Sequence, residues 1–126
     1  MEKILAYTPY ILFGAGAWYL VNGILHDIFV LLSDHGKKYD RDLLRLLMDG
    51  HVLIVGGAIL MICFSGLKAD TACAYYVSLA ITLSMLVYVG MIWPFLKSLA
   101  TGLISLAGLS LTILKIIQIK TQIHHV

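Results

Sequence analysis

Long apolar stretches separated by short polar segments dominate the chain. Asp, Glu, Lys and Arg are absent from residues 4–25, 71–96 and 98–114, and a fourth apolar stretch covers 50–67. A helix needs roughly 20 mostly apolar residues to cross about 30 Å of hydrocarbon. The pattern therefore predicts four membrane-spanning helices, near residues 4–32, 42–65, 71–93 and 96–119.

The segments between these stretches are short and contain turn-forming residues. Residues 33–40 predict a polar turn and 65–70 a short loop, and Pro94 ends the third helix because proline clashes with the preceding turn. Strands are excluded, since an open sheet edge would leave unpaired backbone groups in lipid. Short connections make neighbouring helices antiparallel. We expect an all-α integral membrane protein, a single domain with four transmembrane helices in an up-down-up-down antiparallel bundle.

Composition agrees with this class. Of the 126 residues, 60% are hydrophobic and 13% are charged, whereas soluble domains contain about 25% charged residues. The formal net charge is only +2, and the longest basic run is Lys37-Lys38, so we expect no nucleic-acid partner. The expected surroundings are the lipid bilayer.

Orientation and compartment are only weakly specified by the sequence. The predicted topology puts four cations on the side of the termini and five on the other side, namely Lys3, Lys68, Lys115 and Lys120 against Lys37, Lys38, Arg41, Arg45 and Lys97. The positive-inside rule then favours a cytoplasmic 33–41 loop by one cation. Cys63 and Cys73 flank the short loop; they could pair in an oxidising compartment, but we favour buried free thiols.

Ionisable groups inside the predicted spans gather in the first hairpin. His26 and Asp27 lie on its first helix, and Asp49 and His51 lie on its second. At 1.5 Å per residue, both pairs lie about 10–14 Å below the helix ends. A central charged group costs about 2.5–3.5 kcal/mol on insertion scales, so we predict that these four side chains form the functional layer.

Further polar side chains are expected to support that layer. Helical spacing and the antiparallel topology place six residues at the depth of this layer or on the helix faces that lead to it. They are Tyr19, Asn22, Arg45, Tyr88, Thr101 and Ser105. Arg45 precedes Asp49 by four residues and is expected to pair with it. The fourth helix also carries a small, polar stripe that predicts a packing face, formed by Thr101, Ser105, Gly108, Thr112 and Lys115. Lys115 is expected to extend toward the lipid headgroups.

Imidazole and carboxylate groups suit Zn, Fe or Mn, and facing histidines can hold haem iron. His26 and His51 are therefore the candidate metal or haem ligands. No metal, phosphate-loop or catalytic motif with diagnostic spacing occurs in the sequence. The sequence therefore does not decide whether the protein is an enzyme. The leading interpretation is a homo-oligomeric membrane protein that binds or transports a cation, proton or small ligand at this site. The alternatives are a haem- or quinone-associated redox subunit, and a structural or assembly subunit of a membrane complex.

Overall fold

The computed structural model describes residues 5–94 and 97–123. It contains four long helices, each apolar enough to cross a membrane: α2 (Thr8–Leu32), α3 (Arg41–Ile62), α5 (Ala72–Ile92) and α6 (Leu99–Ile123). No strand occurs in these two ranges. The predicted all-α class with four transmembrane helices is confirmed, and every helix boundary lies within four residues of its predicted position.

Local sequence determines where the helices begin and end. Pro9 lies in the first turn of α2, where its missing N–H costs no hydrogen bond. The Asp40 carboxylate caps α3 by accepting the backbone N–H groups of Asp42 and Leu43, at 3.1 and 3.0 Å. The polar turn before it contains a 3₁₀ turn, η1 (Asp34–Lys37).

The connection expected to be a loop at 65–70 instead contains a short helix, α4 (Phe64–Lys68). Cys63, at the end of α3, keeps right-handed helical dihedral angles, so the chain continues helically after a local break. Leu67 is completely buried and anchors this turn against the rest of the fold.

Glycines line the contact between α2 and α3. A Cβ atom built at Gly57 would lie 2.5 Å from the carbonyl oxygen of Gly16, and one built at Gly23 would lie 2.5 Å from the carbonyl oxygen of Gly50. The glycines of each helix are seven residues apart, about two turns, so they return to one face. Small residues allow helix backbones to approach closely, and these pairs define the antiparallel α2–α3 hairpin.

The predicted packing face of α6 is confirmed. All five of its members, Thr101, Ser105, Gly108, Thr112 and Lys115, are buried. Ser105 donates its hydroxyl proton to the Thr101 carbonyl oxygen at 2.7 Å, so the buried Tyr19 hydroxyl is the donor in its 2.7 Å bond to Ser105 Oγ. This bond joins α2 to α6 and therefore one hairpin to the other.

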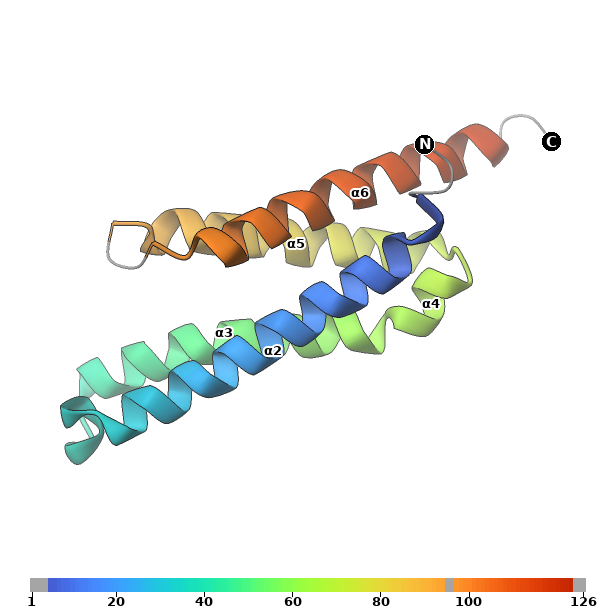
Figure 1. The fold of residues 1–126 in the computed structure, drawn as a ribbon. Helices are drawn as coiled ribbons and strands as arrows, with labels where there is room; N and C mark the ends of the chain where they lie inside the picture. The colour runs from blue at the N-terminus through green and yellow to red at the C-terminus, as the bar shows by residue number, and fades with distance from the viewer. Residues whose placement is uncertain (1–4, 95–96, 124–126) are drawn as a thin grey trace.

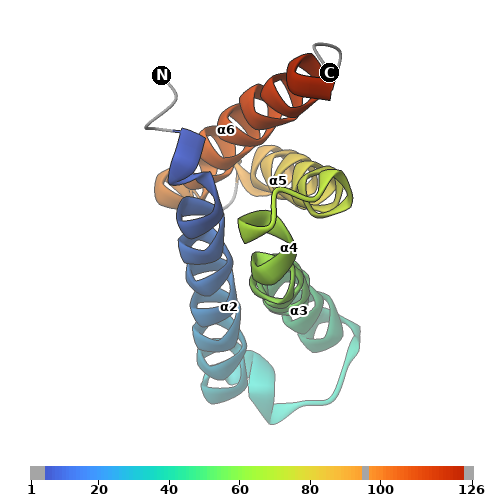
Figure 2. The ribbon, with the colours of Figure 1, turned by 90° about the vertical axis from the view of Figure 1, so that its right-hand side faces the viewer.

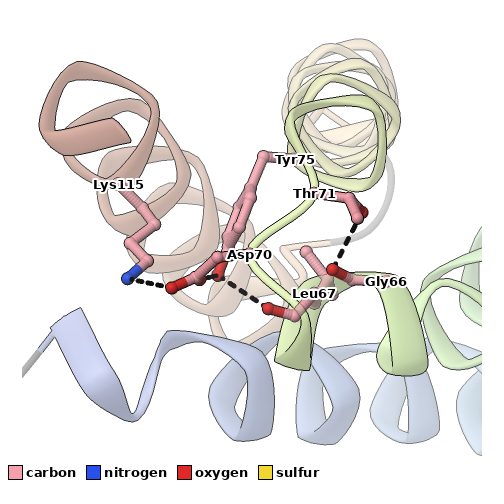
Figure 3. Close-up of polar contacts among 6 residues, drawn as sticks. All are labelled: Gly66, Leu67, Asp70, Thr71, Tyr75 and Lys115. Atoms are coloured by element: carbon pink, nitrogen blue, oxygen red, sulfur yellow. Dashed lines mark hydrogen bonds and ion pairs between the residues drawn. The ribbon is translucent and has the colours of Figure 1, made fainter. Parts of the chain in front are cut away.

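Lys115, which was expected to extend toward the lipid headgroups, pairs with a carboxylate in the exposed connection before α5. Its Nζ donates to Asp70 Oδ2 at 3.1 Å, and the lysine side chain is 10% exposed (Figure 3). The Tyr75 hydroxyl proton faces both Asp70 Oδ1, at 3.0 Å, and the Leu67 carbonyl oxygen, at 3.1 Å. These contacts fasten α6 to the connection between α4 and α5.

The two hairpins, α2–α3 and α5–α6, lie close together at the α4 end and diverge toward residues 33–41 (Figures 1 and 2). At the α4 end they share an apolar cluster of Leu12, Leu67, Ala74 and Tyr75. A second cluster fills the middle of the molecule and consists of Ala15, Tyr19, Leu53, Leu60 and Met85. Beyond it, the separation of the hairpins leaves room for the cavity described below.

Both cysteines are free thiols, in agreement with the favoured interpretation, but only one is sheltered. Cys63 is partly buried, whereas Cys73 is exposed at the start of α5. Burial, and secondarily the nearby Cys73, raise the pKa of the Cys63 thiol. The expectation that both thiols are buried is therefore wrong for Cys73, which precedes the inward-facing Ala74 and Tyr75.

Candidate ligand-binding cleft

A cavity of about 250 Å³ is lined by residues of both hairpins. We call it the hairpin cleft. Its polar lining consists of Asn22, His26, Tyr88, Ser98 and Thr101, and its apolar lining consists of Leu25, Phe29, Leu53 and Ile92. The cleft therefore combines hydrogen-bonding groups with an apolar wall, contributed by all four long helices and the residue preceding α6.

His26 is the only residue with an ionisable imidazole in this lining. It lies six residues before the end of α2, about 9 Å below that end at 1.5 Å per residue. Its Nδ1 is 3.4 Å from Asp27 Oδ1, and the two side chains are 28% and 22% exposed. In the tautomer that carries its proton on Nδ1, the imidazole donates to this carboxylate, and Nε2 is then an acceptor with no partner among the described residues.

The remaining polar groups form a short hydrogen-bonded chain. Ser98 Oγ donates to Thr101 Oγ1 at 2.9 Å, and Trp18 Nε1 donates to the same oxygen at 3.3 Å. Asn22 Nδ2 donates to the Trp18 carbonyl oxygen at 2.8 Å. Within the described part of the chain, the Asn22 amide oxygen and the Tyr88 hydroxyl have no partner. Together with His26, they are the groups that can bind a polar head.

The four ionisable side chains predicted to form one layer are divided among three surfaces. His51 lines a separate groove of about 400 Å³ with Asp27, formed by α2 and α3 alone. Asp49 lies on another surface, beside Arg45. Gly50 faces α2, and at 100° per residue its two neighbours must turn to opposite sides of α3. This rotation is the physical reason for the division.

The division bears on the predicted metal or haem site. Residues 5–94 and 97–123 contain no group of three or more His, Cys, Asp or Glu side chains that could hold a metal ion. His26 and His51 line different cavities, so the geometry of one chain does not support a metal ion or haem shared between them. The expected Arg45–Asp49 ion pair is also absent from these ranges, because an exposed arginine gains little by pairing.

The supporting residues also separate into two groups. Asn22, Tyr88 and Thr101 line the hairpin cleft as expected, whereas Tyr19 and Ser105 are buried in the core and position α6. Sequence reasoning missed Ser98 and the four apolar lining residues. Asn22, Leu25, His26 and Phe29 recur at steps of three, one and three, so the α2 contribution follows a helical stripe that a periodicity search could have found.

Comparisons of the chain with protein-family models, curated proteins and solved structures find no match. The fold itself supports a small multi-pass helical membrane protein. A more specific function must therefore be argued from the chemistry of the cleft.

Proposed function

We propose that the chain binds a small neutral amphiphile, with its polar head in the hairpin cleft and its apolar tail in the surrounding lipid. The observation that carries this proposal is the lining: three unsatisfied polar groups beside an apolar wall, with no Asp, Glu, Lys or Arg among the lining residues. A charged head would lose water without gaining a counter-ion. A neutral head that donates and accepts hydrogen bonds matches Tyr88, Asn22 and His26.

The size of the cleft supports a head group rather than a whole lipid. Its volume of about 250 Å³ is slightly below the roughly 300–1,000 Å³ of pockets that enclose drug-sized ligands. Leu25 and Phe29 line it and are 46% and 69% exposed, so they border the hydrocarbon. A tail would lie along these two side chains, where the bilayer already provides an apolar environment.

The other functions predicted from the sequence have less support from this geometry. Cation or proton transport needs acidic or titratable groups along a path, and the cleft offers a single histidine. A haem held by His26 and His51 together needs both imidazoles in one cavity, and His51 lines a different one. Binding of a neutral amphiphile is therefore the form of the predicted binding role that we adopt.

Photo-crosslinking in phosphatidylcholine nanodiscs tests this function. The probe is a monoacylglycerol with a diazirine near the start of its acyl chain, and labelled residues are identified by mass spectrometry. We expect saturable labelling of the residues that line the cleft. An analogue with a quaternary ammonium or phosphate head should bind at least tenfold more weakly, because the lining offers no counter-charge.

Matched variants make the test specific. His26→Leu and Tyr88→Phe each remove one hydrogen bond of about 0.5–1.5 kcal/mol and should raise the half-saturating concentration by roughly 2–12-fold. His51→Leu and Tyr76→Phe change the same residue types outside the cleft lining and should leave the half-saturating concentration unchanged. Labelling that does not saturate, or equal effects of His26→Leu and His51→Leu, would overturn the proposal. Preferential labelling by the ammonium analogue would favour a cation-binding role instead.

A further inference from the structure

His51 lies midway along α3, at the start of its apolar stretch, and is nevertheless exposed. It follows Arg41 by ten residues and precedes Ile62 by eleven, so it is about 15 Å from either end of α3. Ionisable side chains at this depth normally face a bundle interior or a water-filled cavity and have a partner. Within the described ranges, His51 has no hydrogen-bond partner, and it is absent from the core.

The surface around His51 also contains an acceptor. The groove of about 400 Å³ is lined by Asp27, Leu31, Leu44, Leu47, Met48 and His51. A Cβ atom built at Gly50 would overlap the Asp27 carboxylate, so this carboxylate lies directly against the residue that precedes His51. Donor and acceptor are therefore at nearly the same depth in the membrane. The side chains around them are apolar, and Met48 and Leu31 are 65% and 53% exposed.

We propose that this surface, the His51 groove, binds a second copy of this chain in a two-fold symmetric dimer. The imidazole of His51 in each copy donates to the Asp27 carboxylate of the other. A two-fold interface brings residue i against j and j against i, and a patch that holds a donor and an acceptor at one depth is complementary to itself. The leucines and Met48 of the two copies close around the polar pair and exclude lipid.

Lipid and water cover this surface less well. Acyl chains would cover the leucines, but they offer no hydrogen bond to an imidazole in an apolar surface. A water-filled channel requires a polar wall, whereas four of the six lining residues are leucine or methionine. The His51 groove and the hairpin cleft share no lining residue, and they touch only through the 3.4 Å contact between Asp27 and His26. The dimer contact therefore needs no ligand in the cleft.

Disulfide crosslinking in proteoliposomes tests the interface. Met48→Cys and Leu103→Cys are each introduced into a chain that carries Cys63→Ala and Cys73→Ala. Met48 and Leu103 are 65% and 64% exposed, in the first half of α3 and of α6 respectively, so they are a matched pair. We expect oxidation to give a covalent dimer with Met48→Cys and none with Leu103→Cys. The yield of the Met48→Cys dimer should be the same when the protein is diluted tenfold in lipid before oxidation. No dimer with Met48→Cys, or equal yields from the two variants, would overturn the proposal.

A second measurement tests the polar pair itself. Energy transfer between labelled copies at decreasing protein-to-lipid ratio gives the dimerisation constant. His51→Leu should weaken dimerisation by about an order of magnitude, the effect of losing two interhelical hydrogen bonds of typical strength in a membrane. Leu103→Val, at an exposed apolar position of α6 outside the groove, should leave the constant unchanged. Wild-type dimerisation of His51→Leu would refute the His51–Asp27 pairing.

Discussion

The glycine contact between α2 and α3 predicts that one added methyl group destabilises the fold. Gly57→Ala places a Cβ 2.5 Å from the Gly16 carbonyl oxygen and 2.6 Å from the Leu20 backbone nitrogen. Both neighbours are backbone atoms of a helix, so no side-chain rotation relieves the overlap. The two helices must separate.

The distances set the size of the effect. An ordinary contact begins at 3.4 Å, so the Gly16 oxygen must move by 0.9 Å (3.4 − 2.5). Overpacking of this kind typically costs about 1–3 kcal/mol, and the better helix propensity of alanine returns at most about 1 kcal/mol. We therefore expect Gly57→Ala to lower the free energy of unfolding by about 1–2 kcal/mol.

Gly14→Ala is the matched control, because a Cβ at Gly14 meets nothing within 4 Å. Propensity alone then acts, and this variant should be unchanged or more stable by up to about 1 kcal/mol. The assay is reversible unfolding in mixed micelles, followed by circular dichroism. If the two variants have equal stability, or if Gly57→Ala is the more stable, close backbone packing does not hold the hairpin together.

Two further predictions concern the α4 end of the molecule. Asp70→Asn leaves the Lys115 ammonium, which is 10% exposed, without its counter-charge and should lower the free energy of unfolding by about 2–3 kcal/mol. Lys115→Met leaves a carboxylate that is 54% exposed and should lower it by less than about 1 kcal/mol. Equal losses of stability of the two variants in thermal unfolding would contradict this asymmetry. Burial raises the pKa of the Cys63 thiol, so the rate of its modification by maleimide should keep rising to higher pH in the folded protein than in the denatured chain. The neutral Cys63 thiol stabilises the fold below the pKa that it has in the unfolded chain, and this contribution is lost as pH rises through the raised pKa of the folded state, so Cys63→Ala should reduce the alkaline loss of stability. Identical pH–rate profiles of Cys63 in the folded and denatured protein would refute this prediction.

Hydropathy alone predicted the helices, because a membrane span must be long and apolar whatever it packs against. The errors lie where tertiary contacts decide the outcome. Residues 65–68 form part of α4 because the buried Leu67 stabilises a helical turn. Lys115 pairs with Asp70 across 45 residues, and no local sequence pattern contains such a pairing.

The candidate site was only partly predictable for a related reason. Counting residues from the turn gave the depth of His26 and His51, but depth does not specify direction. Direction follows from which residue of α3 faces α2, and that residue is Gly50, which carries no polar signal. The seven-residue spacing of the glycines contained this information: once Gly16, Gly23, Gly50 and Gly57 are aligned, the opposite directions of His51 and Asp49 follow.

Position 70 must satisfy a backbone requirement and a side-chain requirement, and aspartate is the amino acid that meets both. Its φ of 52° lies in the left-handed region, which admits glycine, asparagine and aspartate most readily. Of these three, glycine accepts no side-chain hydrogen bond from Tyr75, and asparagine accepts one but brings no negative charge to Lys115. A lysine buried in the second half of α6 thus dictates the identity of a residue in the connection before α5, and a replacement of Asp70 calls for a compensating change at Lys115.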